Sequence, residues 1–68
     1  MLYIIKRLKD SYYLNSLEDT KKLIEFTFTP LKSDALMLPE NIAERSLNMI
    51  NEIENDKYKI IPVKWNKK

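Results

Sequence analysis

Five carboxylates gather in one stretch of the sequence, at positions 40, 44, 52, 54 and 56. A pair of carboxylates can hydrolyse a glycosidic bond when one acts as the acid and the other as nucleophile or base. That chemistry needs a cleft that raises one pKa, and 68 residues offer little depth for one. The pattern favours a solvated acidic helix face, which is our alternative binding surface, formed by Glu40, Glu44, Glu52 and Glu54.

The composition argues against most other site chemistry. The chain has no cysteine and no histidine, so it lacks the usual ligands of zinc, iron–sulfur and haem sites and the commonest general base. It also has no glycine, which phosphate-binding loops require. Its serines have no histidine to activate them. We therefore predict no catalytic residue, no cofactor and no metal site, and a protein that is not an enzyme.

Basic and aromatic residues form a second pattern. Residues 39–56 hold five acids and one base, a balance of −4, while the whole chain carries +2, so the remainder carries +6. Cations interleaved with aromatic rings can hold phosphates and stack bases. Alternatively, the aromatic residues fill the core and the lysines protect strand edges. The candidate binding surface comprises Lys6, Arg7, Tyr12, Tyr13, Tyr58, Lys59, Lys64 and Trp65.

The elements that must position these residues follow from hydrophobic spacing. Residues 2–8 and 12–15 are rich in β-branched and aromatic types and predict a hairpin around the turn at 9–11. Residues 16–22 are short and polar, and we expect a loop or a single helical turn there. Residues 23–29 alternate apolar and polar side chains, as a half-buried strand does. Residues 35–38 fit either one helical turn or a brief extended piece.

The strongest helix signal covers about 39–55. It opens with Pro39 and Glu40, which suit a first helical turn, and continues with an apolar stripe of Ile42, Ala43, Leu47, Met49, Ile50 and Ile53. Residues 57–64 return to strand composition, with Pro62 indicating an edge or irregular strand.

Together these elements predict one small α+β domain over residues 1–68, with 66–68 frayed. We expect an antiparallel sheet of three to four strands with the single helix, about 39–55, packed on one face. The opposite face then meets water or a partner. Charged residues interrupt the apolar start of the chain at Lys6 and Arg7, which argues against a signal peptide or a membrane span. We expect a cytoplasmic protein without a membrane partner.

The ordered segments 3–6, 12–14, 28–31, 34–35 and 58–63, with Ala43, resemble those of a loose group of very small bacteriophage and prophage accessory proteins. Those proteins tend to order their elements as strand, strand, polar insert, amphipathic helix and strand. This sequence departs from them by lacking a glycine turn between its first two strands. The resemblance implies a viral protein that resides in the host cytosol and binds a host machine, including defence systems, and it carries over no functional residue.

Three functional hypotheses follow. The leading one is a non-enzymatic interaction protein that binds, and inhibits or redirects, a host or viral protein. The second is a small nucleic-acid-binding module that uses the basic, aromatic-containing strand face. The third is a self-assembling virion component, a homo-oligomer, because so small a sheet must deal with its open edges.

Overall fold

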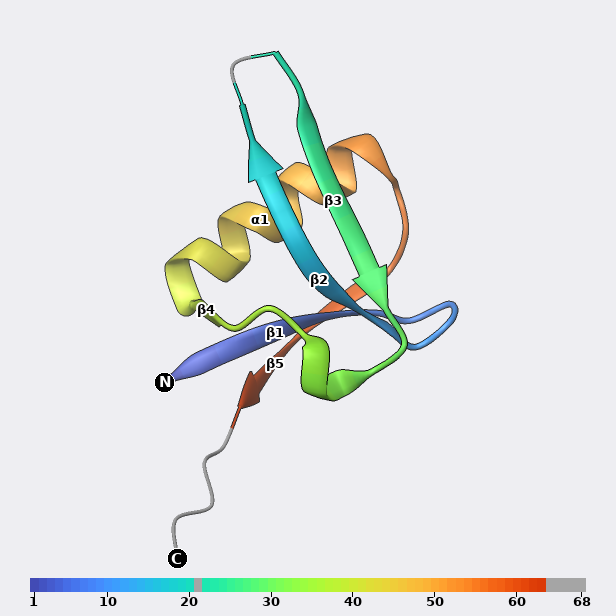
Figure 1. The fold of residues 1–68 in the computed structure, drawn as a ribbon, viewed down its shortest axis with the longest axis vertical. Coiled ribbons are helices and arrows are strands. Elements are labelled where there is room, and N and C mark those ends of the chain that lie inside the picture. The colour runs from blue at the N-terminus through green and yellow to red at the C-terminus, as the bar shows by residue number, and fades with distance from the viewer. Residues whose placement is uncertain (21, 64–68) are drawn as a thin grey trace, which may run out of the picture.

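The computed structural model describes residues 1–20 and 22–63 (Figure 1). Every strand pair in this part of the chain is antiparallel, and one helix packs against the sheet. The predicted α+β class is confirmed, and a two-residue strand brings the sheet to five. The elements are β1 (Leu2–Arg7), β2 (Tyr12–Asp19), β3 (Ile24–Thr29), a 3-10 turn η1 (Lys32–Asp34), β4 (Leu38–Pro39), α1 (Glu40–Ile53) and β5 (Tyr58–Val63).

Strand β1 organises the sheet because it pairs along both of its edges. All six of its residues pair with β5 on one edge. On the other edge, Lys6 and Arg7 pair with β2, whereas Leu2 and Tyr3 pair with β4. Strands β1 and β2 diverge beyond the hairpin, and the segment that leads into β4 bonds to β2 where the Leu36 N–H donates to the Leu14 carbonyl at 2.8 Å. The sheet is therefore bent, with the β2–β3 hairpin running steeply across β1 and β5 (Figure 1).

The predicted turn after β1 is present and closes without glycine. Ser11 adopts a φ of 63°, the left-handed region, and its N–H donates to the Arg7 carbonyl at 2.9 Å. The Asp10 carboxylate accepts a hydrogen bond from the Tyr12 N–H, which stabilises the turn. A residue with a Cβ is strained at this φ, whereas glycine is not.

Replacing Ser11 with glycine is expected to raise the free energy of unfolding by about 0.5–1 kcal/mol, because the left-handed strain is removed. In a domain of this size the midpoint of thermal unfolding should rise by a few degrees. Circular dichroism melts of Ser11→Gly and Ser11→Ala would check this. An equal gain from the alanine variant would show that the backbone conformation is not the cause.

Residues 16–19 correct one sequence prediction: they extend β2 to Asp19 and form neither a loop nor a helical turn. A register shift between Leu14 and Ser16 explains the error. It lets Leu14 and Leu17, three residues apart, face the same side of the sheet opposite Phe28 and Phe26. This bulge interrupts the two-residue period by which a strand is recognised. The alternation of β3, by contrast, is regular and as predicted.

Helix α1 begins immediately after β4 and places Ile50 at the centre of the core. Ile50 is fully buried with Ile5 and Leu14, and half-buried side chains from β2, β3, β4, β5, the helix and the segment before β4 surround these three. The predicted range of 39–55 exceeds the observed helix by a residue or two at each end. Ile53, the last residue of the predicted apolar stripe, is 54% exposed. Ser46 is buried. In the described residues, α1 is too short and too polar to span a bilayer.

Candidate binding face of the sheet

The predicted basic and aromatic residues divide between the two faces of the sheet. Successive residues of a strand point to opposite sides, whereas residues paired directly across antiparallel strands share a side. Lys6, Tyr13 and Lys59 therefore lie on the outer face, away from α1. The other described residues of the predicted binding surface are Arg7, Tyr12 and Tyr58, which lie on the inner face, toward α1. Lys64 and Trp65 fall outside the described residues.

The outer residues form one row across four strands. Lys59 of β5 is opposite Lys6 of β1, Lys6 is opposite Tyr13 of β2, and Tyr13 is opposite Thr29 of β3, giving a row that we call the basic row. The Lys6 ammonium lies 5.9 Å from the centre of the Tyr13 ring. Within residues 1–20 and 22–63, neither lysine forms an ion pair. Like charges opposite one another destabilise a strand pair, so an anionic partner would relieve this repulsion.

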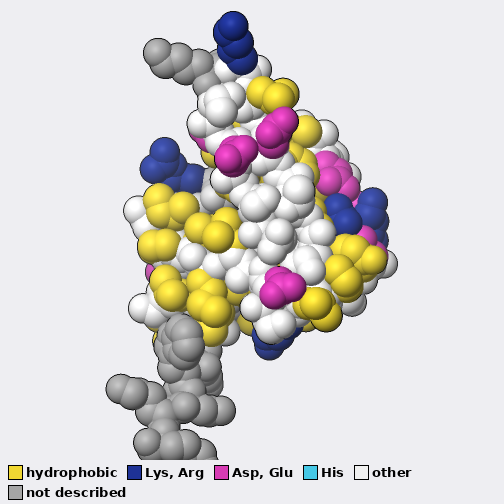
Figure 2. All heavy atoms as spheres, in the orientation of Figure 1, with side chains coloured by type: hydrophobic (Ala, Val, Ile, Leu, Met, Phe, Trp, Pro, Cys, Tyr) yellow, Lys and Arg dark blue, Asp and Glu magenta, His cyan; other side chains and the backbone are white. Residues whose placement is uncertain are grey.

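The same face becomes polar and then acidic along the hairpin. Ser16 and Thr27 share a hydrogen bond of 2.7 Å between their hydroxyls, and the Thr27 hydroxyl is 3.3 Å from the amide oxygen of Asn15. Farther along, Glu18 and Glu25 are directly opposite each other and both exposed. Figure 2 shows neither charged nor hydrophobic side chains over the middle of the hairpin, carboxylates toward its tip, and a Lys or Arg side chain at the very end. The outer face thus carries cations at one end and anions at the other.

On the inner face, Arg7 is held by contacts within the protein. Its guanidinium donates to both Asp10 oxygens, at 2.7 and 3.1 Å, and to Glu54 at 3.0 Å. It also stacks 4.2 Å from the centre of the Phe28 ring. Lys9 adds contacts to Glu54 at 3.7 Å and to Asp56 at 3.3 Å. We call these five charged residues the Arg7 cluster, and its cations are already neutralised.

The Arg7 cluster makes the stability of the protein sensitive to acid. The hydrogen bond from Arg7 lowers the pKa of Asp10 below its usual range, and the hydrogen bond from the Lys57 N–H, with help from Lys9, lowers the pKa of Asp56. A carboxyl group with a depressed folded-state pKa contributes stability above its unfolded value, and this contribution is lost as pH falls through the folded value. We expect the urea midpoint to hold down to about pH 5 and to fall below about pH 4.

The urea midpoint of the Asp10→Asn variant should fall less steeply over this pH range, because this variant has no carboxyl group at position 10 to become protonated. Asp34→Asn is the control, since Asp34 is exposed and forms no ion pair in the described part of the chain. Parallel curves for Asp10→Asn and the unchanged protein would contradict the assignment.

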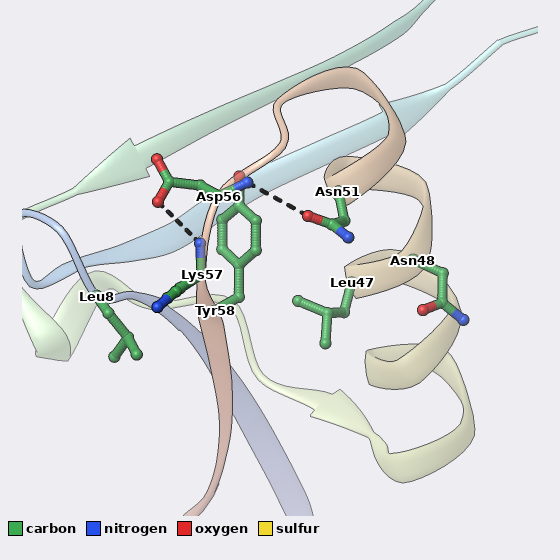
Figure 3. A pocket seen from close by; sticks show the side chains of 7 residues that line it. All are labelled: Leu8, Leu47, Asn48, Asn51, Asp56, Lys57 and Tyr58. Carbon is green, nitrogen blue, oxygen red and sulfur yellow. Dashed lines mark hydrogen bonds between the residues drawn. The ribbon is translucent and has the colours of Figure 1, made fainter.

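A shallow groove of ≈ 410 Å³ lies between α1 and the start of β5 (Figure 3). Tyr58 contributes to its lining, and its hydroxyl donates to the Glu54 carbonyl at 2.7 Å. Burial raises the pKa of Tyr58, so this hydroxyl keeps its proton. The one lining carboxylate, Asp56, accepts the Lys57 N–H at 2.8 Å. The groove lining is Leu8, Leu47, Asn48, Asn51, Asp56, Lys57 and Tyr58, which brings no two carboxylates together.

The alternative acidic surface is divided as well. Glu40, Glu44 and Glu52 are exposed on α1, whereas Glu54 follows the helix and belongs to the Arg7 cluster. Residues 1–20 and 22–63 contain no group of three or more acidic side chains arranged to hold a metal ion.

The sequence prediction missed Thr29, Glu18 and Glu25 as part of the outer face. Nothing in the residue type of Thr29 indicates a binding surface. It belongs to the outer face only because it is paired with Tyr13. The two glutamates flank the β2–β3 turn, and their pairing would have been expected once 16–19 was recognised as strand. Comparison of the chain with protein-family models, with curated proteins and with solved structures finds no match.

Proposed function

We propose that this protein is a non-enzymatic interaction protein that binds another protein through the outer face of its sheet. The observation that carries the proposal is the charge gradient on that face, from Lys59 and Lys6 through Tyr13 to Glu18 and Glu25. Complementary charges guide association and fix the orientation of a partner. An aromatic residue in the middle supplies a rigid contact of the kind enriched in binding hot spots. The resemblance to phage accessory proteins supports a host or viral protein as the partner.

Nucleic acid is the second candidate, and the Lys6–Lys59 pair beside Tyr13 favours it. Each lysine could neutralise a phosphate while the ring stacks on a base. A polyanion that follows the face along the hairpin would, however, meet Glu18 and Glu25. The gradient therefore suits a partner that carries both signs of charge.

Two double variants distinguish these candidates. Lys6→Glu with Lys59→Glu reverses the basic end, and Glu18→Lys with Glu25→Lys reverses the acidic end. For a protein partner, both should reduce recovery from nuclease-treated host lysate by about tenfold or more, because each replaces attraction with repulsion. For nucleic acid, the first variant should weaken binding to a labelled single-stranded oligonucleotide, and the second should strengthen it.

Arg45→Glu is the matched control, since Arg45 is exposed on α1, away from the outer face. Melting curves would establish that each variant is folded. Recovery of the same host protein by all variants at equal yield would overturn the assignment of this face.

A further inference from the structure

In the part of the chain that the structure describes, no strand lies beside the outer edge of β3. Strand β3 ends the sheet order β3-β2-β1-β4, and within the described residues it pairs with β2 alone. Among residues 1–20 and 22–63, the backbone hydrogen bonds outside the regular elements involve none of its six residues. It therefore presents a row of backbone donors and acceptors along one side, which is a template for another strand.

Strand β5, which also lies at an edge of the sheet, shows how an edge is protected, and β3 lacks those devices. Strand β5 contains Pro62 and Lys59, and Lys57 precedes it. Proline and lysine on an edge discourage addition of a further strand. The sequence of β3, Ile-Glu-Phe-Thr-Phe-Thr, has five residues with high strand propensity and a single charge. Its edge is thus suited to pairing.

We propose that two copies of this chain pair through antiparallel β3 edges, with Thr27 opposite Thr27 of the second copy. A two-fold axis at Thr27 places Phe26 opposite Phe28 on the inner side and Glu25 opposite Thr29 on the outer side. Inner apolar residues then face inner apolar residues, and like charges do not oppose each other across the new strand pair.

Charge complementarity favours this register. In each copy the basic row ends at Thr29, and Glu25 is paired with Glu18. With Thr29 opposite Glu25 of the second copy, the basic row of one copy leads directly into the acidic pair of the other. Centring the pair on Phe26 would place Glu25 against Thr27, in line with the Ser16–Thr27 hydroxyls, and would lose this match.

Single-cysteine variants test the pairing, because the chain has no cysteine of its own. Thr27→Cys should form a covalent dimer in a glutathione redox buffer at micromolar concentration, since residues opposite each other on the two-fold axis can be bridged. Ser16→Cys is the matched control: it loses the same hydroxyl–hydroxyl bond but lies one strand farther from the axis. Three strand spacings, about 14 Å, would separate its two copies, which is too far for a disulfide.

Sedimentation equilibrium provides the test without cysteine. The unchanged protein should approach twice its 8.2 kDa mass as concentration rises. Thr27→Lys and Thr27→Glu should each stay monomeric alone, because like charges then meet on the axis, and should form a dimer when mixed. Equal crosslinking of the two cysteine variants, or a monomeric mass at every concentration, would overturn the pairing. The outcome is separate from that of the proposed function, which is tested at Lys6, Lys59, Glu18 and Glu25, because none of the Thr27 variants changes those four residues.

Discussion

Replacing Ile50 with alanine is expected to lower the free energy of unfolding by about 2–5 kcal/mol, the usual cost of a cavity left by a large aliphatic side chain. Ile50 is fully buried against Ile5 and Leu14 and joins α1 to the sheet. A domain this small rarely has more than about 3–5 kcal/mol of stability. Much of the Ile50→Ala protein should therefore be unfolded, which urea titration followed by circular dichroism would show.

Ile53 supplies the matched control from the same helix. Ile53→Ala removes the same atoms, but its side chain is 54% exposed, so the loss should stay below about 1 kcal/mol. Equal losses for the two variants would contradict the position assigned to the core.

Replacing Arg7 with alanine is expected to cost about 1–2 kcal/mol and to lower the thermal midpoint by about 5–15 °C. The Arg7 side chain is 14% exposed, bonds to Asp10 and Glu54, and stacks on Phe28. Its removal leaves two carboxylates without their main partner and uncovers an aromatic ring. It also leaves Lys9 as the remaining ion-pair partner of Glu54 from the first turn.

Arg7→Lys and Arg45→Ala complete this experiment. Lysine keeps the charge but not the planar fork that binds Asp10 and stacks on Phe28, so it should recover less than half of the loss. Arg45 is exposed and has no ion pair in the part of the chain that the structure describes, so Arg45→Ala should change stability by less than about 0.5 kcal/mol. Full recovery by lysine would show that charge alone accounts for the effect.

Local patterns were sufficient to predict most of the fold. The alternation of 24–29 predicted β3, and the stripe that begins after Pro39 predicted α1. The bulge at Asn15 defeated the same method, because it places two inward leucines three residues apart, a spacing that also suits a helix. The pairing of Leu38 and Pro39 with β1 depends on distant residues and leaves no local pattern.

The candidate site was harder to predict, because the register of the strand pairs decides which residues lie on the outer face. Lys6 and Arg7 are adjacent in sequence, and nothing in their types shows that one faces outward and the other binds Asp10, Glu54 and Phe28. Tyr12 and Tyr13 divide in the same way. Composition indicated a basic, aromatic surface, but strand pairing decides which half of it a partner can reach.

The pairing of β1 with β5 also constrains the order in which the molecule can assemble. It joins residues 2–7 to residues 58–63, so the loop of fifty residues from 8 to 57 must close before the central strand acquires this neighbour. The β2–β3 hairpin, whose ends are close in sequence, can form earlier. During synthesis, β1 must therefore wait with one edge uncovered until β5 emerges. An unpaired strand edge of this kind favours aggregation, so the interval before β5 arrives is the one in which the growing chain is most exposed to it.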